Sequence, residues 1–342
     1  MLAAVLYGKE HVEIEPVEVP AIGPGDVLVR VRAALTCGTD VKVFRRGYHA
    51  RMIVPPALFG HELSGDIVAV GSAVENFHVG QRVVAANSAP CGDCLYCRRN
   101  SENLCENLLF NNGAYAEFIR IPERIVQKNL YEIPPNVTYP DAALIEPLAC
   151  VLKGIVDSVV SAGDCVAVIG LGPIGLMFVR IAGLLGARVI AIGRRQGQLD
   201  RALRMGAKDV ISTADTEDVV AAVRAATGGH GADIVIEAVG KPQTWQEAVR
   251  MVRRGGTVNL FGGCPNDTSI SLDTNRLHYS EITLKASFHH TPKLIQRALK
   301  AVARGDITAR DFVNREEPLQ NLLEVFKHLM SHNGHMKTAI IP

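Results

Sequence analysis

The feature that most constrains the fold is a glycine pattern between an apolar segment and a helical one. Residues 165–169, CVAVI, are typical of a buried strand, and 173–185 carry a long apolar helical pattern. Between strand and helix lies the spacing G-x-G-x-x-G, made by Gly170, Gly172 and Gly175 together with Pro173 and Ile174. Such glycines permit a tight turn, a close approach of the backbone to a pyrophosphate and close helix–strand packing. The motif predicts a dinucleotide site at the helix N-terminus. The competing interpretation is a glycine-rich turn in a domain that binds no nucleotide.

Strands and helices alternate after this motif. We expect strands at 188–192, 234–237, 257–261 and 282–284 and a helix at 198–205, which indicates an α/β domain with a parallel, doubly wound sheet. Up to about residue 147, short alternating segments separated by Gly, Pro and Asn indicate mostly β structure. A chain of 342 residues is expected to divide into two domains. Beyond Phe288 the pattern predicts helices at 291–304 and 317–332 and a strand at 337–341, which the residues alone assign to neither domain.

The end of the second strand of the parallel sheet decides which nicotinamide coenzyme binds. A carboxylate there accepts hydrogen bonds from a free ribose 2′-hydroxyl. This chain has Gly193, Arg194 and Arg195 at that point and no acid. The glycine leaves room for a 2′-phosphate, and guanidinium groups hold it by forked, charge-assisted hydrogen bonds. We therefore predict NADP(H) over NAD(H); the alternative is that both arginines belong to a solvated loop.

Four of the eight cysteines crowd into one short segment. They are Cys91, Cys94, Cys97 and Cys105, with the spacing C-x2-C-x2-C-x7-C among turn-forming residues. Four thiolates make a closed tetrahedral zinc site that leaves no position for a substrate, so its role is structural. An iron–sulfur cluster is the competing interpretation, but the spacing departs from the common cluster patterns.

A second set of metal-ligating types is spread along the β-rich part. Its members are Cys37 in LTCGTD, His61 and Glu62 in FGHELSG, and Glu146 in LIEPLAC. A thiolate, an imidazole and a carboxylate suit a catalytic zinc with one open position. Taken singly, each is more often an ordinary core residue than a ligand.

Composition excludes several classes of partner. Lysine and arginine number 36 against 35 acidic residues, so the charge favours neither a nucleic acid nor an anionic membrane. The N-terminus lacks the pattern of a signal peptide, and no apolar run reaches the length of a membrane span. We expect a cytoplasmic enzyme with a small-molecule substrate.

With CGTD, GHE, the cysteine cluster and GLGPIG in this order, the chain resembles the zinc-containing medium-chain alcohol dehydrogenase family over essentially its whole length. EPL around Glu146 is similar to the polyol (sorbitol-like) and threonine dehydrogenase branch. The resemblance implies a GroES-like catalytic domain at 1–149 with a structural zinc lobe at about 88–108, and a Rossmann coenzyme domain at 150–287. It also implies that 288–342 returns to the catalytic domain, and it suggests a homodimer or homotetramer.

The resemblance also implies a role for each residue of the second set. Cys37, His61 and Glu146 would be catalytic-zinc ligands, with Glu62 as an alternate ligand that exchanges with water. Thr39 matches the hydroxyl that takes the substrate proton. Zinc would lower the pKa of an alcohol hydroxyl before hydride passes to the nicotinamide.

The chain departs from the family pattern along the proton route. Lys42 and Lys153 stand where relatives often carry histidine, so His49 or water is the alternative route, and Lys42 is equally interpretable as a surface lysine. His289 and His290, in SFHHTP, align with the substrate-pocket segment of sorbitol dehydrogenases. We expect the pair to lie on a strand, where adjacent side chains point to opposite faces, so at most one of them reaches the pocket.

Three other functions compete with a dehydrogenase. The first is a zinc-bearing, nucleotide-sensing protein without catalytic activity, since fold alone does not prove activity. The second is a zinc-free enoyl or quinone reductase of the same superfamily, which would lack the metal residues. The third is a methyltransferase, which leaves the cysteine cluster unexplained. Within the dehydrogenases, the alternative to a polyol or secondary-alcohol enzyme is a threonine-type NAD-dependent enzyme.

Overall fold

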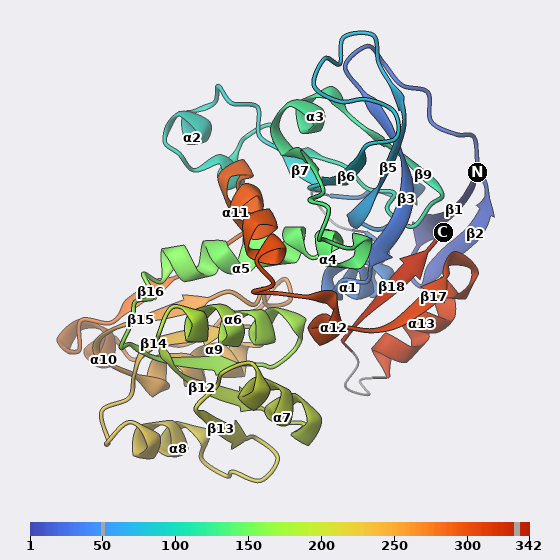
Figure 1. Ribbon diagram of the computed structural model, residues 1–342. Helices are drawn as coiled ribbons and strands as arrows, with labels where there is room; N and C mark the ends of the chain where they lie inside the picture. The colour runs from blue at the N-terminus through green and yellow to red at the C-terminus, as the bar shows by residue number, and fades with distance from the viewer. Residues whose placement is uncertain (49–51, 332–335) are drawn as a thin grey trace. The chain divides into compact units, whose positions relative to one another are not determined.

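The computed structural model describes residues 1–48, 52–331 and 336–342 (Figure 1). The chain divides into two compact units. One comprises Met1–Ala149 and His290–Pro342, and the other comprises Cys150–His289. The first unit is thus built from both ends of the chain, with the second unit inserted between them.

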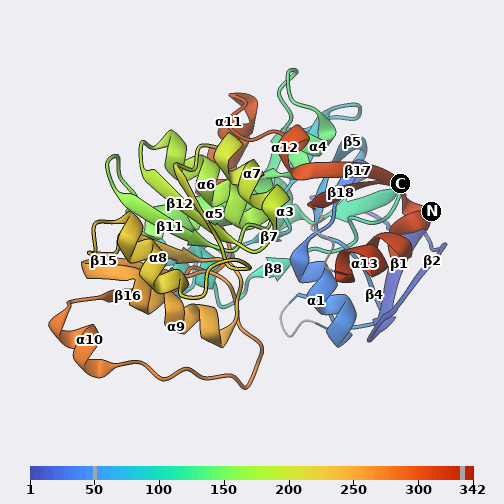
Figure 2. The same ribbon diagram turned by 90° about the horizontal axis from the view of Figure 1, so that it is seen from below.

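The inserted unit contains a fully parallel six-stranded sheet with the order β13-β12-β11-β14-β15-β16. The strands are β11 (Cys165–Ile169), β12 (Arg188–Gly193), β13 (Asp209–Ser212), β14 (Ala232–Glu237), β15 (Val252–Leu260) and β16 (Thr283–Lys285). Helices α6 (Pro173–Leu184), α7 (Gln196–Arg204), α8 (Val219–Ala226), α9 (Pro242–Met251) and α10 (Thr274–Tyr279) connect them (Figure 2). Ala167, Ile190 and Val235 are fully buried, as expected for strands covered on both faces. The predicted doubly wound sheet is confirmed.

The first unit is mainly antiparallel. Its main sheet has the order β10-β6-β5-β3-β18-β17, with β9 also paired to β3. These strands are β3 (Val27–Leu35), β5 (Glu62–Val70), β6 (Arg82–Ala85), β9 (Phe118–Ile121), β10 (Leu130–Glu132), β17 (Val313–Pro318) and β18 (Lys337–Ile341). A smaller sheet contains β1 (Leu2–Gly8), β2 (His11–Pro16) and β4 (Ala57–Leu58), and β7 (Ser88–Ala89) pairs with β8 (Leu109–Phe110). The C-terminal strand β18 therefore pairs with β3, which begins at Val27, and with β17 from the same end of the chain.

Short helices connect and cover these strands. They are α1 (Gly38–Arg46), α2 (Leu95–Arg98), α3 (Glu123–Asn129), α4 (Tyr139–Ala143), α11 (Pro292–Ala303), α12 (Ala309–Phe312) and α13 (Leu322–Met330). Helix α5 (Ile145–Asp157) begins in the first unit and continues into the inserted one from Cys150. The predicted helix at 317–332 is wrong over its first residues, because Glu317 and Pro318 end strand β17. That strand pairs with β18, a long-range contact that helical periodicity does not register. Among the described residues, no helix is long and apolar enough to cross a membrane.

Candidate active site

Helix α1 fixes the first candidate ligand through its N-cap. Cys37 is the N-cap, and its Sγ accepts a hydrogen bond from the backbone N–H of Thr39 at 3.4 Å. Asp40 completes a capping box by accepting from the backbone N–H of Cys37 at 3.3 Å. Gly47 ends the helix at φ 88°, a conformation that favours glycine. The cap therefore fixes the positions of Cys37, Thr39 and Asp40 relative to one another.

Asp40 also orients the second candidate ligand. Its Oδ1 lies 2.8 Å from Nδ1 of His61, and its Oδ2 accepts a hydrogen bond from the Tyr115 hydroxyl at 2.6 Å. Burial lowers the pKa of His61, but the negative charges of Asp40 and Cys37 outweigh it and hold that pKa well above its ordinary value. A carboxylate on Nδ1 leaves Nε2 as the ring atom for a metal. Sequence reasoning missed Asp40, although its place three residues after a cap position was a usable signal.

Glu62 lies fully buried next to His61 and is paired with a lysine from the far end of the chain. Nζ of Lys337 lies 2.7 and 2.6 Å from the two carboxylate oxygens of Glu62 and 3.1 Å from the carbonyl oxygen of Thr36. Burial raises the pKa of Glu62, and the positive charge of Lys337 opposes that shift. Glu62 is therefore an acceptor in a buried ion pair in this structure.

The donor atoms of the first three candidates lie close together. One ligand atom each from Cys37, His61 and Glu62 lies within 4.8 Å of the other two. A thiolate, an imidazole and a carboxylate at this spacing fit a four-coordinate zinc ion and leave its fourth coordination position open. Lys42 is exposed on α1, and His49 lies outside the described residues.

Glu146 occupies the first turn of α5, where it is 7% exposed. Burial raises its pKa to about 7, whereas the charge of His61 lowers it. Nε2 of His290 lies 3.7 Å from Oε1 of Glu146 and 3.0 Å from Oδ1 of Asn87. The buried carboxyl group thus has an imidazole partner from the returning tail.

The expectation that the two adjacent histidines lie on a strand is wrong. Strand β16 ends at Lys285, and His289 adopts a left-handed backbone conformation at φ 61°. The turn at His289 redirects the chain, and His290 is buried. Strand alternation therefore does not decide where either histidine points.

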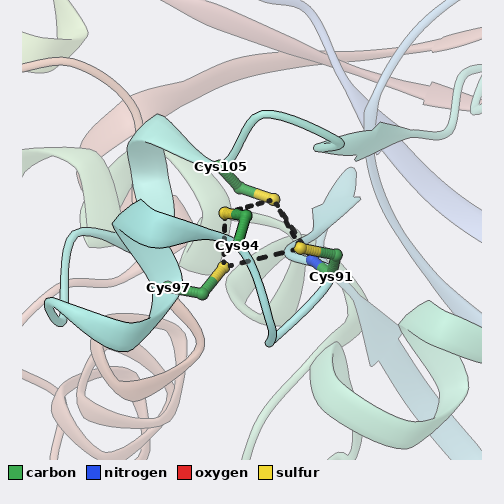
Figure 3. A group of neighbouring side chains, drawn as sticks. All are labelled: Cys91, Cys94, Cys97 and Cys105. Atoms are coloured by element: carbon green, nitrogen blue, oxygen red, sulfur yellow. Dashed lines mark hydrogen bonds between the residues drawn. The ribbon is translucent and has the colours of Figure 1, made fainter.

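The cysteine cluster surrounds a common centre (Figure 3). Neighbouring sulfur atoms are separated by 3.9 Å between Cys91 and Cys97, 3.5 Å between Cys94 and Cys97, 3.9 Å between Cys94 and Cys105 and 3.4 Å between Cys105 and Cys91. Four ligands about 2.3 Å from a tetrahedral zinc have sulfur–sulfur distances of about 3.8 Å. Backbone hydrogen bonding, led by the N–H of Cys97, lowers the pKa of Cys94 to about 6. The four side chains fit a structural zinc.

The glycine motif occupies the turn between β11 and α6. Gly170 has φ 94°, and a Cβ on Gly175 would lie 1.7 Å from the carbonyl oxygen of Gly170. A Cβ on Gly172 would meet no atom within 4 Å, so the space above this residue is open. Pro173 and Ile174 open α6, whose N-terminal N–H groups follow directly. The turn therefore has the close packing and the open approach that a pyrophosphate site requires.

Strand β12 ends at Gly193, and Arg195 caps the N-terminus of α7. A Cβ on Gly193 would lie 2.7 Å from Cδ1 of Leu171, so any side chain here would have to displace that leucine. Arg194 is exposed, and Arg195 is half-buried. Burial lowers the pKa of Arg195, and the charge of Arg194 lowers it further. Two guanidinium groups therefore crowd the end of the second strand in sheet order.

Known proteins resemble the chain along its full length. Residues 23–134 match the alcohol dehydrogenase GroES-like domain, and residues 173–304 match the zinc-binding dehydrogenase family. Sorbitol dehydrogenase of Bacillus subtilis is 29% identical and covers 100% of the chain and 97% of its own length. L-threonine 3-dehydrogenase of Bacillus licheniformis is 33% identical over 98% of the chain and 96% of its own length.

A solved structure described as a putative zinc-binding dehydrogenase from Sinorhizobium meliloti, bound to NADP, is 31% identical. It covers 100% of this chain and 99% of its own, with a TM-score of 0.91. These matches confirm the predicted family and its polyol and threonine branch. The chain is a zinc-dependent oxidoreductase of the alcohol and polyol dehydrogenase type that uses a nicotinamide coenzyme and a small alcohol substrate. It belongs to the zinc-containing medium-chain alcohol dehydrogenase family.

Proposed function

We propose that the enzyme transfers a hydride between NADP(H) and a polyol or another secondary alcohol. The observation that carries the coenzyme preference is the pair Arg194 and Arg195 after β12, where no carboxylate is present. Guanidinium groups at this point favour a ribose that carries a 2′-phosphate, because they form forked, charge-assisted hydrogen bonds to it. The relative that is bound to NADP supports the choice of coenzyme. The relative named sorbitol dehydrogenase supports a polyol as the substrate.

Within this proposal, Cys37, His61 and Glu146 hold the catalytic zinc, and Glu62 serves as an alternate ligand. A zinc ion held there would supply Lewis acidity toward the substrate oxygen, and a nicotinamide coenzyme would supply the hydride-accepting group. Asp40 keeps the His61 ring in one tautomer and orientation through the 2.8 Å contact with Nδ1. Cys91, Cys94, Cys97 and Cys105 hold the structural zinc.

Thr39 is proposed to take the substrate proton. Its hydroxyl both donates and accepts, and its backbone N–H is fixed to the sulfur of Cys37 by the helix cap. Since Lys42 is exposed, the proton passes from Thr39 to water in this proposal. We also propose that the chain assembles as a homodimer or homotetramer through the coenzyme domain, in line with its branch of the family.

The test measures kcat/KM with NADP+ and with NAD+ against a panel of polyols, secondary alcohols and L-threonine, with and without a zinc chelator. We expect chelator-sensitive oxidation of a polyol and a preference for NADP+. The variant Arg194→Ala/Arg195→Ala should lose at least about tenfold in kcat/KM with NADP+, because each charge-assisted contact is worth about 1.5–3 kcal/mol.

The same variant should retain its kcat/KM with NAD+. Arg204→Ala, exposed in the last turn of α7, is the matched control and should change neither value. Turnover of L-threonine with NAD+ alone would replace the proposal with a threonine-type NAD-dependent enzyme. Equal loss with both coenzymes would show that the arginines do not read the 2′-phosphate.

A further inference from the structure

A cavity lined by arginines opens on the inserted unit. It has a volume of about 400 Å³, within the range of small-molecule pockets. Residues from the end of α8, the loop after it, the start of β15 and helix α10 line it. Figure 2 shows these elements in the inserted unit. The lining residues are Arg224, Gly229, His230, Val252, Arg253, Arg254, Arg276 and Ser280. Among these described lining residues there is no aspartate or glutamate.

The cavity lies at the edge of the sheet opposite the coenzyme motif. β14 and β15 run parallel, and their first paired residues are Ala232 and Val252, so the cavity adjoins the N-terminal ends of these strands. The glycine motif follows the C-terminal end of β11 at Ile169. Dinucleotides bind at the C-terminal edge of such sheets. The arginine cavity is therefore a separate feature of the same domain.

Two of the arginines are fixed by the protein. Arg276 donates from Nε to the carbonyl oxygen of Val249 at 3.1 Å and from Nη2 to those of Arg250 and Val252 at 3.1 and 3.0 Å. Nε of Arg253 lies 2.5 Å from Oδ1 of Asp233. The Arg276 contacts close the C-terminal end of α9, and the Arg253 contact ties its guanidinium group to strand β14. Both guanidinium groups are thereby held in place.

The other two arginines have no comparable structural duty. Arg224 donates only one weak bond that the structure shows, from Nη2 to the carbonyl oxygen of Arg250 at 3.4 Å. Within the described part of the chain, Nε of Arg224 is buried without a hydrogen-bond partner. Arg254 is exposed at the rim. Stabilisation of the C-terminal end of α9 therefore explains the placement of Arg276. It does not explain the placement of Arg224 and Arg254.

Like charges accumulate here without enough acids to neutralise them. Burial lowers the pKa of Arg276, as do the charges of Arg224 and Arg250, and only Asp273 raises it. Asp273 also caps α10, and Asp233 is engaged by Arg253. Four guanidinium groups and His230 line the cavity, and these two nearby carboxylates already have partners. A bound anion with several negative charges would relieve this repulsion.

We propose that this cavity binds a small molecule carrying a diphosphate or triphosphate group. Guanidinium groups match phosphate oxygens with forked hydrogen bonds, and the fixed pair Arg253 and Arg276 reduces the entropy lost on binding. Arg224 and Arg254 supply the remaining donors. The site is distinct from the coenzyme site and independent of the coenzyme preference proposed above.

Calorimetric titration of the full zinc-loaded chain, saturated with NADP+, tests the proposal. Sodium tripolyphosphate and ATP are the two probes, which distinguish a free polyphosphate from a nucleotide-linked one. The test variant is Arg224→Gln/Arg254→Gln. The control variant, Arg204→Gln/Lys208→Gln, removes the same charge from two exposed residues of the same unit. We expect one saturable site in the wild type and the control, and at least tenfold weaker binding in the test variant.

The single variant Arg254→Gln, at an exposed position, should weaken binding by a smaller factor. It replaces the double variant as the test if the double variant does not fold. Equal affinity in the wild type and the test variant would overturn the proposal, because these arginines would then not take part in binding. An equal loss of affinity in test and control would overturn it too, because binding would then follow net charge alone. So would failure of both probes to bind. Binding of a single-stranded oligonucleotide without binding of either probe would assign the patch to a nucleic acid instead.

Discussion

Nζ of Lys337 lies 2.6 and 2.7 Å from the two carboxylate oxygens of Glu62, although the residues are 275 positions apart in the chain. Both side chains are almost fully buried, with exposed fractions of 4% and 0%. A buried carboxylate without a partner is far less stable than one with an ion-pair partner. The pair therefore attaches the last strand of the first unit to the neighbour of His61.

Replacing Lys337 with methionine should lower the free energy of unfolding by about 3–5 kcal/mol, because it leaves the Glu62 carboxylate buried and unpaired. Urea denaturation measures the loss. The double variant Lys337→Met/Glu62→Gln should recover part of it, because the uncompensated charge is gone. If the double variant is less stable than Lys337→Met, the pairing does not account for the effect.

The metal-stripped protein should lose stability as pH rises from about 4.5 to about 7 because of Glu146. Burial raises the pKa of this carboxyl from 4.5 to about 7, so the folded state binds the proton more tightly than the unfolded state. That contribution is fully present below pH 4.5 and is lost as pH rises through 7, at a cost of about 3 kcal/mol.

Urea midpoints of the stripped wild type and of Glu146→Gln, measured at several pH values in this window, check the prediction. The wild-type curve should fall relative to the variant curve as pH rises. The pKa of His61 is also raised, but the groups that raise it, Asp40 and Cys37, are present in both proteins. Parallel curves would exclude Glu146 as the titrating group.

Gly193→Ala should lower the free energy of unfolding of the inserted unit by about 1–3 kcal/mol, because the new methyl group overpacks its core. The added Cβ would lie 2.7 Å from Cδ1 of Leu171. A double-mutant cycle with Leu171→Ala measures the coupling, and the methyl group should cost less when the leucine is shortened. Additive effects would mean that Gly193 is needed for another reason, such as access of the 2′-phosphate.

Cys97→Ser should remove about one zinc per chain and leave the other in place, because the closed site needs all four thiolates. Metal analysis after dialysis measures the stoichiometry, and limited proteolysis should show new cleavage between residues 88 and 108. Cys264→Ser, outside both ligand sets, is the control and should retain the wild-type zinc content. Loss of both zinc ions from Cys97→Ser would indicate that the two sites are not independent.

Local patterns predicted much of the fold. β11 and β18 have the expected bounds, and α6 ends one residue before its expected end, because a run of apolar residues and a glycine turn are local signals. Strand β17 was missed because its pairing with β18 is a long-range contact. The candidate ligands followed from motif and resemblance.

Their supporting partners did not follow from the sequence. Lys337 and His290 each reach a candidate ligand from a distant segment of the chain, and no periodicity marks such a contact. The capping box of Cys37 and Asp40 is a local pattern, because the two residues are only three positions apart, and the sequence could have predicted it.

The position of β18 between β3 and β17 has a consequence for synthesis on the ribosome. The inserted unit, residues 150–289, is complete before the final strand emerges, so it is free to fold first. The first unit has to wait with an open sheet edge beside β3 until residues 337–341 arrive. Its unpaired backbone groups make this waiting edge a target for chaperone binding and for premature aggregation.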